Sequence, residues 1–129
     1  MDHSPQERAN LALVRAMFDE MLNPMDAGAV DRFIAPGYIQ HNPNVETGRA
    51  PLKAFLDHIK ALNPQGVHDV KRMFADGDHV IVHYHVRRWP GDAGWAVIDI
   101  FRIEDGLVAE HWDVAQDVVT GGPNVNGMF

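Results

Sequence analysis

The chain has 129 residues, 46% of them hydrophobic and 22% charged, which is enough for one domain with a substantial core. Its formal charge is −7, from 11 basic and 18 acidic residues, so we expect no nucleic-acid partner. The absence of cysteine excludes disulfides, thiolate catalysis and cysteine-ligated zinc. The N-terminus has no signal-peptide pattern, and no apolar run reaches the roughly 20 residues that cross a bilayer. We therefore expect a cytoplasmic protein without membrane contact.

The first part of the chain predicts two helices. Ser4-Pro5-Gln6-Glu7 is typical of a helix start, with Ser4 as N-cap and Glu7 completing a capping box. Apolar residues then recur at helical spacing until Asn23-Pro24 ends the helix. Asp26 predicts the start of a second, shorter helix.

A brief extended segment and a third helix follow. Pro36-Gly37 turns the chain into Tyr38–His41, which ends at Asn42-Pro43. The third helix begins after Gly48, carries one apolar stripe, and stops at Asn63-Pro64.

The hydrophobic period then changes to two, which predicts four strands. They are Val67–Ala75, His79–Trp89, Trp95–Ile103 and Leu107–Val118. Helices followed by an antiparallel meander indicate an α+β fold, with three N-terminal helices covering one face of a strongly curved sheet. We expect residues 1–129 to form a single domain with an irregular tail from about Thr120. The other face of the sheet is then free, and we expect a homodimer formed through it.

Several local motifs accompany this layout. They are Tyr38–Pro43, Gly48-Arg49, Val82–His85, Asp99, Asp105-Gly106, Glu110–Asp113 and Asn126–Phe129. Together they resemble the SnoaL-like polyketide cyclase group of the nuclear transport factor 2-like superfamily, in particular its bacterial branch of predicted aldol-condensation enzymes. The resemblance runs from about Gln6 to the end of the chain. It implies a cone-shaped α+β domain whose mixed or antiparallel sheet encloses a pocket.

The resemblance also implies a chemistry. In the characterised cyclases of this type, an aspartate on the last strand is the general acid/base, and a histidine on the preceding strand lines the same pocket. Asp113 matches the aspartate by position, whereas Asp99 stands at the position of the histidine. The family resemblance therefore implies cofactor-independent enolisation with aldol-type condensation or cyclisation of a small carbonyl compound.

The turn between the last two strands decides which side chains share the pocket. A three-residue loop, Glu104–Gly106, places Asp99, His111 and Asp113 on one face, with Asp99 opposite His111. A two-residue turn, Asp105-Gly106, instead leaves Asp99 beside Trp112 and puts Asp113 on the other face. We favour the three-residue loop, because it groups the ionisable side chains with apolar ones.

We predict Asp113, Asp99 and His111 as the catalytic residues. An apolar pocket raises the pKa of an aspartate, and a second carboxylate raises it further, which suits proton transfer beside a carbonyl. Asp113 would be the base and then the acid, while Asp99 and His111 would set its protonation. The structural alternative is that Asp99 only pairs with His111 or Arg102.

Six further residues are predicted to bind the substrate, a small apolar or cyclic carbonyl compound. They are Tyr38, His41, Phe55, His83, His85 and Trp112. Tyr38 either donates its hydroxyl to a developing enolate or packs in the core. His83 and His85 point to the same face of a strand, and His83 is expected to hydrogen-bond a ligand oxygen. Gln40 and Asn42 are interpreted as loop and turn residues.

Two other functions stay open. The same pocket can hold a ligand without changing it, as in a small-ligand-binding protein. A less favoured alternative is a metalloprotein with His41, His83 and His85 as ligands. Because a His-x-His spacing is weak and Val86–Trp89 offers no carboxylate, we expect neither a metal nor a cofactor.

Overall fold

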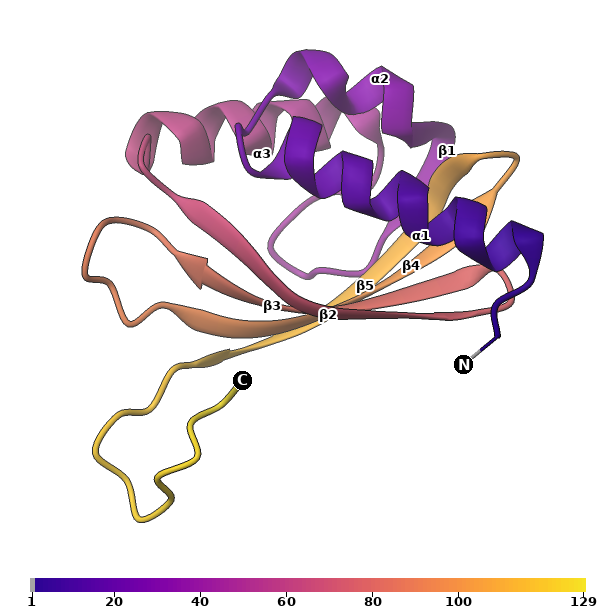
Figure 1. Cartoon of the computed structure of the whole chain (residues 1–129). Helices are drawn as coiled ribbons and strands as arrows, with labels where there is room; N and C mark the ends of the chain where they lie inside the picture. Colours follow the sequence, from indigo (N-terminus) through magenta and orange to yellow (C-terminus); the bar gives the residue numbers. More distant parts are fainter. Residues whose placement is uncertain (1) are drawn as a thin grey trace.

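The computed structural model describes residues 2–129 (Figure 1). Helix α1 (Pro5–Met17) continues into a π-helical turn, η1 (Phe18–Leu22). A single 3₁₀ turn, η2 (Ala27–Ala29), leads into the short helix α2 (Val30–Phe33), and α3 is Arg49–Leu62. All three α-helices lie on one side of the sheet, as the sequence predicts. None of the helices in the described residues is long and apolar enough to cross a membrane.

The predicted helix starts are confirmed. Ser4 Oγ accepts a hydrogen bond from the Glu7 backbone N–H at 3.0 Å, and the Ser4 N–H donates to Glu7 Oε1 at 2.9 Å. Asp26 Oδ1 accepts from the Gly28 N–H at 2.9 Å. The first helix ends at Asn23, whose N–H reaches back five residues to the Phe18 carbonyl, the bond that defines a π turn.

Five strands form one mixed sheet. They are β1 (Ile34–Gln40), β2 (Val67–Asp76), β3 (His79–Arg87), β4 (Trp95–Glu104) and β5 (Leu107–Asp117). Their order is β1-β5-β4-β3-β2, with β1 parallel to β5 and every other neighbouring pair antiparallel. The fold is α+β, as predicted, and the sheet does not close on itself. Register shifts in the β1–β5, β2–β3 and β4–β5 pairs favour bending of the sheet around the helices.

The hairpin between β4 and β5 corrects the predicted three-residue loop. Glu104 pairs with Leu107, so the turn contains only Asp105 and Gly106, with φ of 51° and 74°. Positive φ at both central residues is the requirement of a type I′ turn. The predicted consequence of such a turn is also wrong, because Ala109 is an extra residue in β5.

This bulge restores the shared face. Arg102 pairs with Glu110, and from there Asp99 lies opposite Asp113, not opposite His111. Asp99, His111 and Asp113 therefore point to the same side of the sheet. The expected face is right, although the expected cross-strand partner is wrong.

The core lies between the helices and the concave face of the sheet. The ring of Phe18 packs edge-on against Tyr84 at 5.0 Å and against Phe101 at 6.2 Å. These are favourable aromatic geometries for a buried junction of helix and sheet. The C-terminal tail runs on the opposite side of the sheet, where the Phe129 ring stacks on His85 at 4.5 Å (Figure 1). A homodimer through that face stays a prediction.

Candidate active site

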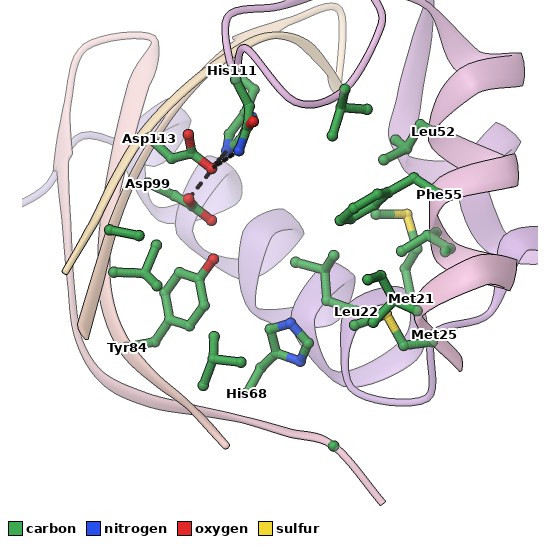
Figure 2. Close-up of a pocket in the computed structure, with 18 of the residues that line it drawn as sticks. Met21, Leu22, Met25, Leu52, Phe55, His68, Tyr84, Asp99, His111 and Asp113 are labelled. Atoms are coloured by element: carbon green, nitrogen blue, oxygen red, sulfur yellow. Dashed lines mark hydrogen bonds and ion pairs between the residues drawn. The ribbon is translucent and has the colours of Figure 1, made fainter. Parts of the chain in front are cut away.

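A cavity of about 410 Å³ lies between the helices and the concave face of the sheet (Figure 2). This volume is in the range of about 300–1,000 Å³ typical of small-molecule sites. Its walls are mostly apolar. They include Met21 and Leu22 from the first helical segment, Met25 from the turn after it, and Leu52, Phe55 and Leu56 from α3. Phe55 lies where the sequence predicts it, in the cavity wall, and is 36% exposed.

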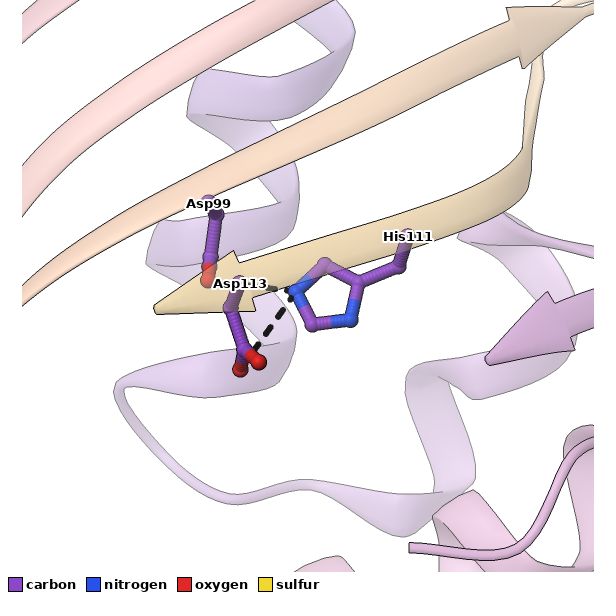
Figure 3. A group of neighbouring side chains, drawn as sticks. All are labelled: Asp99, His111 and Asp113. Carbon is purple, nitrogen blue, oxygen red and sulfur yellow. Dashed lines mark ion pairs between the residues drawn. The ribbon is translucent and has the colours of Figure 1, made fainter. Parts of the chain in front are cut away.

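Asp99, His111 and Asp113 meet at one end of this cavity (Figures 2 and 3). His111 Nε2 lies 3.1 Å from Asp99 Oδ1 and 3.9 Å from Asp113 Oδ2, so the imidazole stands between two carboxylates. The side chains are 3% exposed for Asp99, 10% for His111 and 17% for Asp113. Asp113 is therefore the most accessible of the three acid–base groups.

Asp99 is the buried member of this group. Its Oδ1 has no aligned hydrogen bond, and the Tyr84 hydroxyl lies close enough to the carboxyl to lower its pKa. Burial raises the pKa of Asp99 above its ordinary value, even though His111 and Tyr84 pull it down. Burial and the charge of Asp99 likewise raise the pKa of Tyr84, which stays protonated and available as a donor.

Gln40 holds the other side of the His111 ring. Gln40 Oε1 lies 2.7 Å from His111 Nδ1 and can only accept, so the ring carries a proton on Nδ1. The Asn42 backbone N–H also donates to Gln40 Oε1, at 3.0 Å, which fixes the orientation of the amide. Burial alone lowers the pKa of His111, but its contact with Asp99 and the charges of both aspartates outweigh burial and raise it. The two aspartates therefore favour the protonated, cationic form of His111.

Tyr38 completes the chain of polar contacts. Its hydroxyl accepts from Gln40 Nε2 at 3.0 Å, which leaves its own proton free for a ligand. Burial and the charges of Asp99 and Asp113 raise its pKa, so the hydroxyl remains a donor. Tyr38 lines the cavity, as predicted.

Asn42 is a second residue that sequence reasoning missed, together with Gln40. Asn42 Nδ2 donates to Asp113 Oδ2 at 2.9 Å. The available signal was the strand period, since Tyr38 and Gln40 alternate onto one face of β1. What the sequence did not reveal is that β1 pairs with β5, with Gln40 beside His111.

The structure corrects the predicted placement of four substrate-binding residues, because the lining of the cavity does not include His41, His83, His85 or Trp112. His41 Nε2 lies 2.7 Å from Glu110 Oε2, and its ring stacks on Trp112 at 5.0 Å. Glu110 and Trp112 alternate with His111 and Asp113 along β5, so they occupy the convex face.

His83 and His85 lie on this convex face too, opposite Ile98 and Ala96 of β4. His83 Nδ1 contacts Arg72, while His85 Nε2 donates to the Ala93 carbonyl at 2.6 Å. Their alternation with Val82 and Tyr84, which face the core, explains the placement. The two residues share a face, as predicted, but it is the opposite face from the one predicted.

The positions of His41, His83 and His85 do not form the three-histidine metal site considered above, because these side chains do not come together. Within residues 2–129, the side chains close enough to share a metal ion are Asp99, His111 and Asp113, whose potential ligand atoms lie within 4.8 Å of one another. One of these carboxylates already has a hydrogen-bond donor, because Asn42 Nδ2 donates to Asp113 Oδ2. This donor would compete with a metal.

Comparison with known proteins then identifies the family. A model of the SnoaL-like domain matches residues 14–111, about three-quarters of the chain. The chain belongs to the SnoaL-like family. The matched region contains Asp99 and His111 and ends two residues before Asp113. No curated protein matches this SnoaL-like chain.

Solved structures share the fold. A predicted SnoaL-like polyketide cyclase from Jannaschia sp. CCS1 is 23% identical with a TM-score of 0.74, covering 89% of this chain and 90% of that one. A predicted polyketide cyclase from Bacillus cereus ATCC 10987 is 15% identical with a TM-score of 0.75, covering 88% of this chain and 78% of that one. TsrD from Streptomyces laurentii is 23% identical with a TM-score of 0.65, covering 88% and 91%. At these identities the similarity is one of fold.

Proposed function

We propose that this SnoaL-like protein is a cofactor-independent enzyme that enolises a small cyclic carbonyl compound and forms, or breaks, a carbon–carbon bond by aldol chemistry. One observation carries the proposal. A partly accessible carboxylate, Asp113, lies beside a histidine and a buried carboxylate in a mainly apolar cavity of about 410 Å³. Proton transfer at carbon needs such a group, shielded from bulk water but open to the ligand.

The proposed reaction begins with Asp113. Its carboxylate accepts a proton from the carbon next to the carbonyl, while the Tyr38 hydroxyl donates a hydrogen bond to the oxygen that becomes an enolate. The enolate carbon then bonds to a second carbonyl carbon of the same molecule. The proton held by Asp113 passes to the new alkoxide, which restores the carboxylate. Atoms and charges balance without an oxidant or reductant.

Asp99 and His111 support this cycle without touching the reacting carbon. The imidazole between the two carboxylates separates their charges, and Gln40 fixes its tautomer. Asn42 donates to one oxygen of Asp113, which orients the carboxylate toward the cavity. The substitution of an aspartate at the family's histidine position therefore adds a buried partner for His111.

The test follows proton exchange at carbon, which does not require the natural substrate. We would incubate the protein with 2-tetralone, a flat bicyclic ketone, in deuterium oxide and follow loss of the α-proton signals by NMR. Asp113→Asn keeps the shape of the side chain and should lower the exchange rate by about 10²- to 10⁴-fold. The matched control is Asp117→Asn on the exposed end of the same strand, which should retain the native rate.

Two results would contradict the proposal. One is native-like exchange in Asp113→Asn. The other is tight binding of 2-tetralone and related cyclic ketones by the native protein with no exchange above the buffer rate, which would favour a small-ligand-binding protein.

A further inference from the structure

His68 is a polar residue in the cavity wall that the proposed chemistry does not use. It lies near the start of β2, opposite Val86 of β3, and its ring lines the cavity (Figure 2). Its backbone N–H donates to Asn23 Oδ1 at 2.7 Å, at the point where the first helix ends. A helix end and a strand thus hold His68 in place from two sides.

The imidazole of His68 lacks a complete set of partners. Its Nδ1 is buried and has no hydrogen-bond partner among the described residues. Burial lowers the pKa of His68 to about 4, so the ring is neutral at physiological pH. Buried polar groups are nearly always satisfied in folded proteins, so an unsatisfied one in a cavity wall calls for an explanation.

The position of His68 relative to the acid–base groups gives that explanation. Its ring lies 5.8 Å from the Tyr84 ring, and the charge of Asp99 acts on the Tyr84 hydroxyl. Tyr84 therefore separates His68 from the Asp99–His111–Asp113 group along one wall (Figure 2). Facing that wall are mainly apolar side chains, Met21, Leu22 and Met25 among them. His68 therefore offers a polar group on the same wall as the acid–base group, with the Tyr84 ring between them.

We propose that His68 binds a hydroxyl group on the ligand, at the side of its ring system away from the enolised carbonyl. The assignment of the carbonyl end rests on the proposed function. A neutral imidazole has one donor and one acceptor nitrogen, and a hydroxyl can pair with whichever of the two faces the cavity, because it both donates and accepts. The substrate class is then a flat cyclic ketone with an uncharged hydroxyl remote from the reacting carbon.

The test compares 2-tetralone with its four phenolic derivatives, which are isomers of one another hydroxylated at ring position 5, 6, 7 or 8. We would measure dissociation constants by calorimetry. At least one isomer should bind the native protein about tenfold more tightly than 2-tetralone, as expected for one hydrogen bond in an apolar site. In His68→Phe this advantage should fall below twofold. His58→Phe, which changes an exposed histidine on α3, is the matched control and should keep it.

A second measurement uses the unmodified protein, since a phenylalanine at position 68 alters packing as well as polarity. The ring nitrogens of His68, followed by ¹⁵N NMR, should shift with the preferred isomer and not with 2-tetralone. Equal binding of all five compounds by the native protein would overturn the proposal. It would also be overturned if His68→Phe kept the tighter binding of the preferred isomer while the His68 nitrogens of the native protein did not shift. Neither readout depends on turnover. If binding did not depend on His68 but α-proton exchange was normal, the role of His68 would be wrong and the proposed function would stand. If binding depended on His68 but no exchange occurred, the proposed function would be wrong and the role of His68 would stand.

Discussion

The two faces of the sheet each carry a histidine paired with a carboxylate, and the pairs behave differently. On the concave face, His111 Nε2 lies 3.1 Å from Asp99 Oδ1, with side chains only 10% and 3% exposed. On the convex face, His41 Nε2 lies 2.7 Å from Glu110 Oε2, with side chains 42% and 18% exposed. Glu110 and His111 are consecutive residues of β5, so a single step along the strand separates the two environments.

The comparison indicates that burial, rather than the distance between nitrogen and oxygen, decides how strongly the charges of a histidine–carboxylate pair interact. The shorter pair, His41 and Glu110, faces water. The contacts of Glu110 with His41 and Arg102 lower its pKa. In the longer pair, burial raises the pKa of Asp99 despite the opposing effect of His111, and the two aspartates raise the pKa of His111 despite its burial. Water screens the outer charges, whereas the cavity wall leaves the inner ones to act on each other.

The largest effect should come from breaking the inner pair. His111→Phe keeps a ring that can stack on Phe101, as His111 does at 5.0 Å, but leaves Asp99 without its cation. We expect a loss of about 3 kcal/mol in the free energy of unfolding at pH 6.5, measured by urea denaturation.

The same variant has a pH signature with a definite sign. The raised pKa of Asp99 in the fold means that the variant loses stability as the pH rises above about 4, the ordinary pKa of an aspartate. Because the pKa of His111 is raised in the fold, its contribution to the free energy of unfolding of the native protein is fully present below about pH 6.5, the ordinary pKa of a histidine. The stability gap should therefore widen between pH 4 and pH 6.5, and a gap independent of pH would refute the pairing.

An intermediate effect should follow from changing the residue that orients the inner histidine. Gln40→Met has a similar size but cannot accept from His111 Nδ1 or donate to Tyr38. We expect α-proton exchange of 2-tetralone to fall about tenfold, with the ring proton of His111 redistributed between its two nitrogens in ¹⁵N NMR. Gln116→Met, an exposed change on β5, should alter neither quantity. An unchanged tautomer in Gln40→Met would show that Gln40 only packs.

The smallest effect should come from the outer pair. Glu110→Gln removes the carboxylate that contacts His41 and Arg102, but at a surface where solvent competes for both partners. We expect an exchange rate within twofold of native and a much smaller change in urea midpoint than in His111→Phe. Because the pKa of Glu110 is lowered in the fold, any stabilisation exists above about pH 4 and weakens with added salt. A loss equal to that of His111→Phe would remove the distinction between the faces.

Local patterns were sufficient for most of the elements and for part of the site, but not for β1, which runs through Pro36-Gly37, where the sequence predicts a turn. Capping by Ser4 and Asp26 and the stop at Asn23 depend on residues close in sequence, and all three are confirmed. Tyr38, Phe55, Asp99, His111 and Asp113 line the cavity as predicted. His83 and His85 could not be placed, because a strand with apolar residues on one face and histidines on the other is compatible with either orientation until a second layer packs on it.

The amino-acid sequence by itself determined where the helices and the four antiparallel strands lie, since caps, turns and hydrophobic period act over a few residues. Only the tertiary structure decided which side chains meet. The extra residue at Ala109 rotates His111 and Asp113 onto the face of Asp99. The parallel pairing of β1 with β5 brings Gln40 and Asn42 to residues about 70 positions later. Both depend on contacts between distant segments, and such contacts form only when the helices and the sheet bury a common core.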